Sequence, residues 1–168
     1  LSFLPLSHVF ERMAGYYLMI YIGATIAYAE NLDTVPQDLL EIRPTFILGV
    51  PRFYEKIMAR VLEAAAHSSA FKKRLFEWAK GLGKKRRERL VEGRKLDALF
   101  WLQYRLADWL VYRKVKRRLG GRIRFCVAGG AALPKEIAEF FYDLGVMIYE
   151  GYGLTEASPV ISANREKK

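Results

Sequence analysis

Short apolar runs alternate with longer helical stretches along this 168-residue chain, and this alternation constrains the fold more than any other feature. Runs of four to six mostly apolar or β-branched residues are typical of buried strands. They are Ala24–Ala29, Thr45–Val50, Ile123–Ala128 and Val146–Tyr149. Strands separated by helices favour a mostly parallel sheet with helices on its faces. The expected fold class is therefore α/β.

Two helices are predicted between these strands. Thr34–Ile42 follows Asp33 and stops before Arg43 and Pro44, because proline disfavours helix in the residue ahead of it. Pro134–Tyr142 begins with proline at a first-turn position, where the missing N–H costs nothing.

One crossover is much longer than the others, and about residues 53–119 are expected to form a helical insertion within it. Phe53–Ala66 reads as one helix, and Phe71–Lys80 as a second that Gly81 and Gly83 interrupt. A third is predicted over Leu96–Leu119. It carries leucines at helical spacing on one side: Leu96, Leu99, Leu102, Leu106 and Leu110.

The net charge of +10 is concentrated in this insertion, where residues 72–95 hold eleven Lys or Arg against three Glu. One interpretation is a solvated helical surface. The other is a patch for anionic lipid headgroups, to which each basic residue contributes about 1 kcal/mol. Nearby aromatic residues suit either a membrane interface or packing between helices: Trp78, Phe100, Trp101, Tyr104, Trp109 and Tyr112.

The apolar composition is that of a domain with a sizeable core rather than of a membrane span. Hydrophobic residues make up 52% of the chain. Met13–Ala29 lacks charge, but Gly15 and Gly23 within it favour a helix followed by a buried strand. Cys126 is the only cysteine, so no internal disulfide can form and a buried thiol is expected, which fits a reducing cytoplasm.

Two glycine-bearing segments follow predicted strands, and they are the candidates for chemistry. Residues 128–134 leave one strand, and residues 149–159 follow the next. The carboxyl ends of parallel strands meet at the edge where ligands bind, so both segments should face one crevice. Tyr152 offers a flat face for a base, Thr155 a hydroxyl for phosphate, and Glu156 an oxygen ligand for Mg²⁺. An N-cap pair is a competing interpretation of Thr155 and Glu156.

At these residues the chain resembles the adenylate-forming (AMP-binding) superfamily. Within it, residues 4–12, residues 50–55 and the long helical insertion resemble the long-chain fatty acyl-CoA synthetases. Gly151-Tyr-Gly-Leu-Thr-Glu156 is similar to the core motif of that superfamily, and Gly129-Gly130-Ala131 to the glycine-rich segment upstream of it. Leu4-Pro-Leu-Ser-His8 resembles an earlier motif, in which a histidine or aromatic residue follows a turn. The three occur in family order over nearly the whole chain.

The resemblance implies a role for each matching residue. Tyr152 would stack on adenine, while Gly151, Gly153 and the segment Gly129, Gly130, Ala131 would border the nucleotide and the acyl group. Thr155 would bind the phosphate of ATP or AMP, and Glu156 would help to hold Mg²⁺. His8 would lie beside the acyl carboxylate and the α-phosphate. Considered alone, His8 reads as a structural or surface histidine.

The implied activity is ATP-dependent conversion of a long-chain fatty acid to acyl-AMP and then to acyl-CoA, with ATP, Mg²⁺ and coenzyme A taking part. The protein would be cytoplasmic, with peripheral contact at the inner face of a membrane through the basic helices. Two alternatives stay open: an adenylation domain for amino or aryl acids, and a non-catalytic basic helical module that binds membrane or nucleic acid. Nucleic acid is the less expected partner.

Residues 1–168 are expected to be an internal fragment of a large AMP-binding domain, with strand–helix–strand structure at 123–163 carrying the nucleotide loops. The family's phosphate loop would lie before Leu1. Its ribose-binding aspartate and catalytic lysine would lie after Lys168. The isolated fragment is therefore expected to lack adenylation activity.

Overall fold

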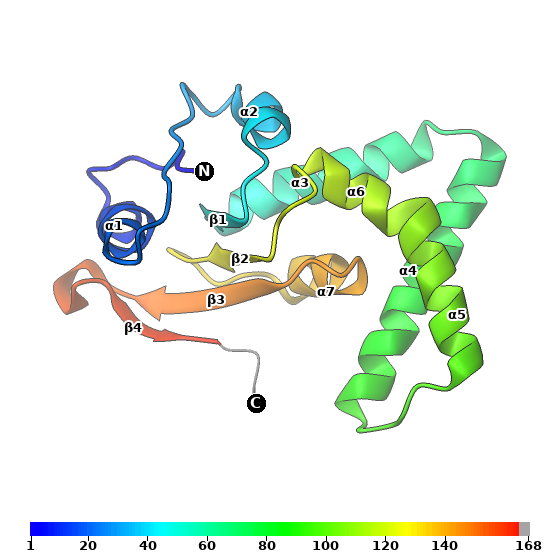
Figure 1. The fold of residues 1–168 in the computed structure, drawn as a ribbon. Helices are drawn as coiled ribbons and strands as arrows, with labels where there is room; N and C mark the ends of the chain where they lie inside the picture. Colours follow the sequence, from blue (N-terminus) through cyan, green and yellow to red (C-terminus); the bar gives the residue numbers. More distant parts are fainter. Residues whose placement is uncertain (165–168) are drawn as a thin grey trace.

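A computed structural model describes residues 1–164 and confirms the α/β fold class (Figure 1). Its four-stranded sheet has the order β1-β2-β3-β4, with β1 Phe46–Gly49, β2 Phe125–Ala128, β3 Ile148–Gly153 and β4 Val160–Ala163. β1, β2 and β3 are parallel, and β4 is antiparallel to β3. Three of the four predicted strands are thus present, and β4 was not predicted.

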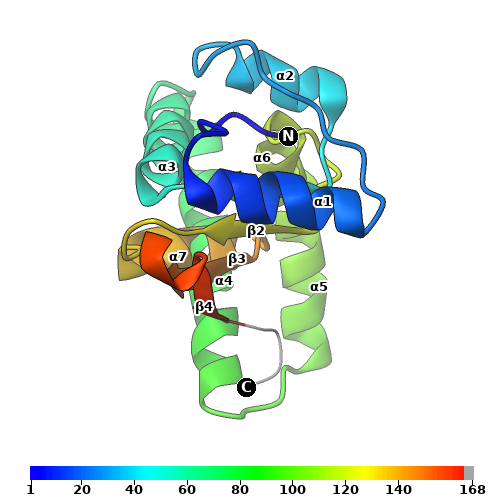
Figure 2. The ribbon, with the colours of Figure 1, turned by 90° about the vertical axis from the view of Figure 1, so that its left-hand side faces the viewer.

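Alternation along the strands separates two faces of the sheet. Ile47, Cys126 and Ala128 belong to the main hydrophobic core, which extends to α3 (Pro51–Ala66) and α7 (Lys135–Asp143). The opposite face carries Phe125 and Val127, which look toward the N-terminal helix. This helix consists of η1 (Glu11–Tyr17) and α1 (Leu18–Tyr21). Figure 2 shows α1 on one side of the sheet and α7 on the other.

The long crossover between β1 and β2 is helical, as predicted. It contains α3, α4 (Ala70–Val91), α5 (Ala98–Ala107), the π-helical turn η2 (Asp108–Tyr112) and α6 (Arg113–Arg118). α4 and α5 form a hairpin that extends away from the sheet (Figure 1). The smaller predicted helix before β1 is α2 (Val35–Ile42).

The expected strand at Ala24–Ala29 is wrong. Only Tyr28 forms a bridge there, parallel to Ser2, and the backbone bonds at that point join Ser2 to Ala27 and Ala29. The segment is extended next to a single residue, and a strand needs a partner along its length. An apolar run at this position therefore does not enlarge the sheet.

The expected helix break at Gly81 and Gly83 is also wrong, because α4 continues through both residues. Gly83 lies against the backbone carbonyl of Asp143 at the end of α7, where an added Cβ would collide. Its small size is used for close packing between helices, which outweighs the roughly 1 kcal/mol that glycine costs in a helix.

The leucines predicted on one side of the third helix divide between core and surface, because Leu96 and Leu110 are partly buried against the core. Leu99, Leu102 and Leu106 are 66%, 66% and 48% exposed, whereas α5 buries Phe100 and Ala107. Side chains on the neighbouring side of α5 pack against α4, so the middle of the leucine row is not the buried face of this helix.

The buried thiol is confirmed. Cys126 is unpaired and 2% exposed, and burial raises its pKa to about 12. It therefore stays protonated at neutral pH and acts as a small apolar side chain in the core.

Candidate nucleotide site at the carboxyl edge of the sheet

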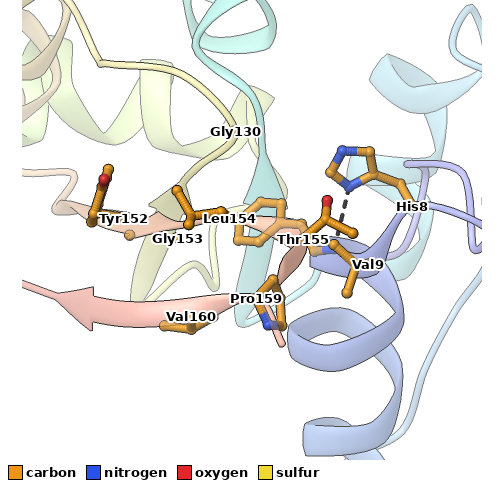
Figure 3. Close-up of a pocket in the computed structure, with 11 residues that line it drawn as sticks. His8, Val9, Gly130, Tyr152, Gly153, Leu154, Thr155, Pro159 and Val160 are labelled. Carbon is orange, nitrogen blue, oxygen red and sulfur yellow. Dashed lines mark hydrogen bonds between the residues drawn. The ribbon is translucent and has the colours of Figure 1, made fainter. Parts of the chain in front are cut away.

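The predicted site residues gather at the carboxyl edge of the parallel strands around one pocket of about 160 Å³ (Figure 3). Six of them line it: His8, Gly130, Gly151, Tyr152, Gly153 and Thr155. Three separate segments of chain therefore meet here: the order of strands predicted that the two glycine-bearing segments would meet, and the family resemblance implied that His8 would join them. Figure 3 shows Tyr152 at the far end from His8, with Thr155 between them.

The Gly151–Gly153 segment lies within β3 rather than in the loop that was expected after it. The pairing of β3 with β2 ends at Glu150. Beyond that point β3 pairs with β4 instead, Gly151 with Ala163 and Tyr152 with Ser162. An irregularity follows between Tyr152 and Gly153. Gly153 lies against the carbonyl of Pro159, a position that leaves no room for a side chain. The pairing holds this segment in an extended conformation with Tyr152 62% exposed.

The glycine segment after β2 is held to β3 by a side chain that the sequence analysis missed. The Leu133 N–H donates to the Glu150 carboxylate over 3.0 Å, and Glu150 is a residue of β3. Within the segment, Gly130 has a φ of +80°, a conformation that favours glycine. The sequence did offer one indication of this hydrogen bond, because Glu150 directly follows a predicted strand and precedes Gly151 of the motif.

Phe10 is a second residue that the sequence analysis missed. Gly129 does not line the pocket, but the Phe10 ring occupies the space that a Gly129 side chain would need. Ala131 is exposed and also lies outside the pocket lining. Gly129 therefore acts through Phe10, which does line the pocket.

His8 is oriented by a local hydrogen bond. Its Nδ1 accepts from the Phe10 N–H over 3.2 Å, at the start of the N-terminal helix. With Nδ1 as the acceptor, Nε2 is the ring nitrogen left for a ligand. The sequence motif thus combines a turn, a helix start and a histidine at the pocket wall.

Glu156 is exposed in the 3-10 turn η3 (Thr155–Ala157), directly after Thr155 but outside the residues lining the pocket. Within residues 1–164, no three His, Cys, Asp or Glu side chains come together to hold a metal ion. Mg²⁺ at phosphate-binding sites takes most of its ligands from water and substrate phosphates. One exposed carboxylate from this chain is compatible with such a site.

A larger apolar cavity adjoins the pocket. It has a volume of about 460 Å³ and lies between the N-terminal helix and the second face of the sheet. Its lining includes Ala14, Leu18 and Val127. Phe10, Gly151 and Val160 line both spaces. The site therefore combines a polar pocket at the sheet edge with an apolar compartment of the size that ligand sites have.

A mostly parallel open sheet with such a pocket at its carboxyl edge is the architecture of an α/β ligand-binding protein. Comparison with known proteins makes this specific. The family model described as "AMP-binding enzyme" matches residues 1–168, and the chain belongs to this family.

Curated relatives include fatty-acid–CoA ligases from three kingdoms of life. Long-chain-fatty-acid–CoA ligase ACSBG2 of Gallus gallus is 35% identical over 161 residues, which is 94% of this chain and 21% of the relative. The peroxisomal long chain acyl-CoA synthetase 6 of Arabidopsis thaliana is 37% identical, covering 99% and 22%. The putative fatty-acid–CoA ligase fadD11 of Mycobacterium tuberculosis H37Rv is 33% identical, covering 99% and 29%. The chain thus spans less than a third of each.

A solved structure shares the fold. The A domain of carboxylic acid reductase from Segniliparus rugosus, in complex with AMP and a co-purified carboxylic acid, aligns with a TM-score of 0.60 and 25% identity. The alignment covers 98% of this chain and 21% of that chain. The similarity supports assignment of the present sheet to an adenylate-forming domain.

Proposed function

We propose that the protein containing this chain activates a long-chain fatty acid at the expense of ATP. The fatty carboxylate attacks the α-phosphate of Mg-ATP, which gives acyl-AMP and releases pyrophosphate. The thiol of coenzyme A then attacks the acyl carbon and AMP leaves. One observation carries the proposal: the polar pocket with the family motifs shares three lining residues with an apolar cavity of about 460 Å³.

The polar pocket suits the nucleotide. The exposed Tyr152 ring offers a stacking surface for adenine, and the Thr155 hydroxyl lies at the pocket wall where it can donate to a phosphate oxygen. Bound Mg²⁺ would neutralise phosphate charge, with Glu156 as its ligand from this chain. His8 Nε2 is placed to donate to developing negative charge near the reacting carboxylate.

The apolar cavity suits the hydrocarbon chain. It lies between the N-terminal helix and the sheet, and Phe10 and Gly151 line both this cavity and the nucleotide pocket. A carboxylate bound at the pocket would therefore direct its tail under the helix. Each methylene removed from water there contributes about 0.8 kcal/mol, which favours long acids over short ones.

The nucleotide assignment is tested by Glu156→Gln and Thr155→Val in the natural full-length protein, with AMP release measured over a series of fatty acids. We expect each variant to lose turnover by about 100-fold, because Thr155→Val removes a donor to developing charge and Glu156→Gln removes the anionic ligand of the metal. Glu136→Gln changes an exposed glutamate on α7 and serves as the matched control. Unchanged turnover in Glu156→Gln would refute the metal assignment.

The acyl assignment is tested separately by Ala14→Leu, which places extra volume in the apolar cavity. We expect the preferred acid to become shorter while turnover with short acids is retained. Ala66→Leu, at the exposed end of α3, is the matched control. A chain-length profile that does not move would show that the acyl tail lies elsewhere.

The basic helices carry a separate proposal, contact with a membrane, which rests on a different surface of the molecule. Within residues 1–164, no helix has the length and apolar character needed to cross a bilayer.

A further inference from the structure

Two adjoining cavities lie along α3. The larger, of about 370 Å³, is lined by residues of α2, α3 and the end of α6, and the smaller, of about 170 Å³, by residues of α3, α4, η2 and α6. Val61 and Arg118 line both, so the two form one groove, here called the α3 groove. None of the residues 1–164 that line it also lines the nucleotide pocket or the apolar cavity under the N-terminal helix.

The wall that α3 contributes to this groove is apolar. Phe53, Ile57 and Val61 follow one another at four-residue spacing, which places them in a row along one side of the helix. α2 adds Leu40, which is 54% exposed. From Phe53 to Ala65, which lines the smaller cavity, the helix rises about 18 Å. The groove is therefore long enough for an extended long-chain acyl tail.

The charge that lines the α3 groove is positive. Asp33 is its one acidic residue in the part of the chain that the structure describes, and it lies in the larger cavity. Five exposed cations line the groove, and none forms a salt bridge with another residue of 1–164: Lys56, Arg60, Lys72, Lys114 and Arg118. The groove therefore combines an apolar wall with several cations that are free to pair with a ligand.

A ligand that matches both features has one long alkyl chain and a head with several negative charges. Each methylene that the apolar wall removes from water strengthens binding about fourfold. Lysine and arginine side chains bind phosphate through charge-assisted hydrogen bonds. A fatty carboxylate has a single charge and would leave most of the cations unpaired. A long-chain acyl-CoA carries an alkyl chain and several phosphate charges in one molecule, so it matches the groove better.

The position of the groove allows it to bind such a ligand while the nucleotide pocket is occupied. Figures 1 and 2 show α2, α3 and α6 at the end of the molecule opposite the loop that joins α4 to α5. The nucleotide pocket is built from the N-terminal segment, the loop after β2, and β3 and β4. The two sites therefore draw on different elements of the fold.

We propose that the α3 groove is a second binding site for long-chain acyl-CoA. The alkyl chain lies along Phe53, Ile57 and Val61, and phosphate groups of the head contact Lys114 and Arg118. The choice of acyl-CoA rests on the function proposed above, because acyl-CoA is the product of that reaction. The groove thus binds a product molecule outside the site where the product forms.

The test is calorimetric titration of the natural full-length protein with stearoyl-CoA below its micelle concentration. The nucleotide pocket is first saturated with a stearoyl-AMP analogue that has a sulfamate in place of the phosphate. We expect stearoyl-CoA still to bind, and stearate to bind at least about tenfold more weakly because it lacks the phosphate contacts.

The phosphate contacts are tested by Lys114→Gln/Arg118→Gln. We expect about tenfold weaker binding of stearoyl-CoA, because two charge-assisted contacts are lost. Lys73→Gln/Lys80→Gln is the matched control, since it removes two exposed cations of α4 that line neither cavity. The control should bind as the parent does.

The alkyl contacts are tested by Leu32→Ser/Leu40→Ser, which changes two leucines of the larger cavity that are 65% and 54% exposed. We expect about tenfold weaker binding of stearoyl-CoA. Leu90→Ser/Leu99→Ser is the matched control, because these leucines are 42% and 66% exposed and line neither cavity. Both substitutions are at the surface, so circular dichroism should show a folded protein in each case.

Three results would overturn the proposal. The first is no binding of stearoyl-CoA once the analogue has saturated the nucleotide pocket. The second is equal affinity in the groove variants and their controls. The third is tighter binding of stearoyl lysophosphatidate than of stearoyl-CoA, which would assign the groove to a phospholipid. Failure of the function proposed above would appear separately, as no binding of the stearoyl-AMP analogue.

Discussion

The carboxyl edge of the sheet and the helical hairpin are built in different ways. At the edge, Tyr152, Thr155 and Glu156 are exposed, and their positions follow from backbone pairing and glycine geometry. In the hairpin, side chains are interlocked: the Tyr112 hydroxyl donates to the Ala79 carbonyl over 2.5 Å, and Arg87 joins α4 to α7. We infer that substitutions in the hairpin cost stability, whereas substitutions at the edge cost ligand binding.

The largest effect on stability is expected from Gly83→Val. The new side chain would collide with the backbone of Asp143, which cannot move without separating α4 from α7. Overpacking of this kind costs about 3 kcal/mol of unfolding free energy, measurable by urea denaturation. Gly81→Val is the matched control, because nothing lies within 4 Å of a Cβ at Gly81 in the same helix. Equal destabilisation of both variants would contradict the packing role of Gly83.

A somewhat smaller effect is expected from Arg87→Met. Arg87 contacts Asp143 at 2.8 Å and Glu139 at 2.7 Å, and Asp143 is 9% exposed. Removal of the cation leaves a buried carboxylate without its partner, which should cost about 2 kcal/mol at neutral pH. Arg89→Met breaks an exposed pair with Asp97 and should cost less than about 1 kcal/mol.

The pH dependence sharpens this prediction. Burial already raises the pKa of Asp143, and the Arg87 hydrogen bond and charge oppose that rise. Without Arg87 the folded-state pKa rises further above its ordinary value of 3.8. A raised carboxyl pKa gives stability that is present at low pH and lost as pH rises through the folded pKa. Arg87→Met should therefore be least destabilised in acid. A constant difference across pH would contradict this account.

The two regions also differ in how far sequence reasoning reached. Alternation of strand and helix predicted the parallel strands, and their carboxyl ends predicted that Gly130, Tyr152 and Thr155 line one pocket. The pairing of β3 with β4 was missed because β4 is exposed along its whole length and has no buried face to produce a pattern. The role of Phe10 was missed because it depends on a contact with Gly129, far away in sequence.

In the hairpin, helices were predicted but their faces were not. The leucine spacing identified one apolar side with Leu99, Leu102 and Leu106, yet α5 buries Phe100 and Ala107 instead. Hydrophobic periodicity shows that a helix has an apolar side. Where a helix has two, as α5 does, tertiary packing decides which one is buried.

At the edge of the sheet, Gly153→Ala should weaken nucleotide binding more than it lowers stability. Its methyl group would collide with the Pro159 carbonyl and displace β4 from β3, next to Tyr152 and Thr155. We expect about tenfold weaker AMP binding, equivalent to about 1.4 kcal/mol, measured by calorimetry on the natural protein. Gly81→Ala in α4 is the matched control, because nothing lies within 4 Å of its added methyl group and Gly81 does not line the pocket. Equal affinity in the two variants would show that the β3–β4 geometry is unimportant.

The smallest effect is expected from a substitution at Glu11, in the N-terminal helix next to the nucleotide pocket. The substitution tests whether this region also contains a buried charge that lowers stability. Glu11 opens η1 and is 1% exposed. One carboxylate oxygen accepts from the Ser2 hydroxyl over 2.5 Å, and the other has no hydrogen-bond partner among the described residues. Burial raises the pKa of Glu11 above its ordinary value of 4.5, against the opposing effect of the Ser2 hydrogen bond.

Because this pKa is raised in the folded state, the contribution of Glu11 to stability is present below the ordinary pKa and lost as pH rises through the folded one. The glutamine in Glu11→Gln does not titrate, so the variant should have the same unfolding free energy as the parent in acid and a larger one above neutral pH. Each kcal/mol gained should raise Tm by about 2–4 °C. Thermal melts of both proteins across pH measure the difference. A gap that does not widen with pH would mean that the carboxylate is compensated when charged, and the two regions would then share one principle of construction, with charges buried only beside a partner.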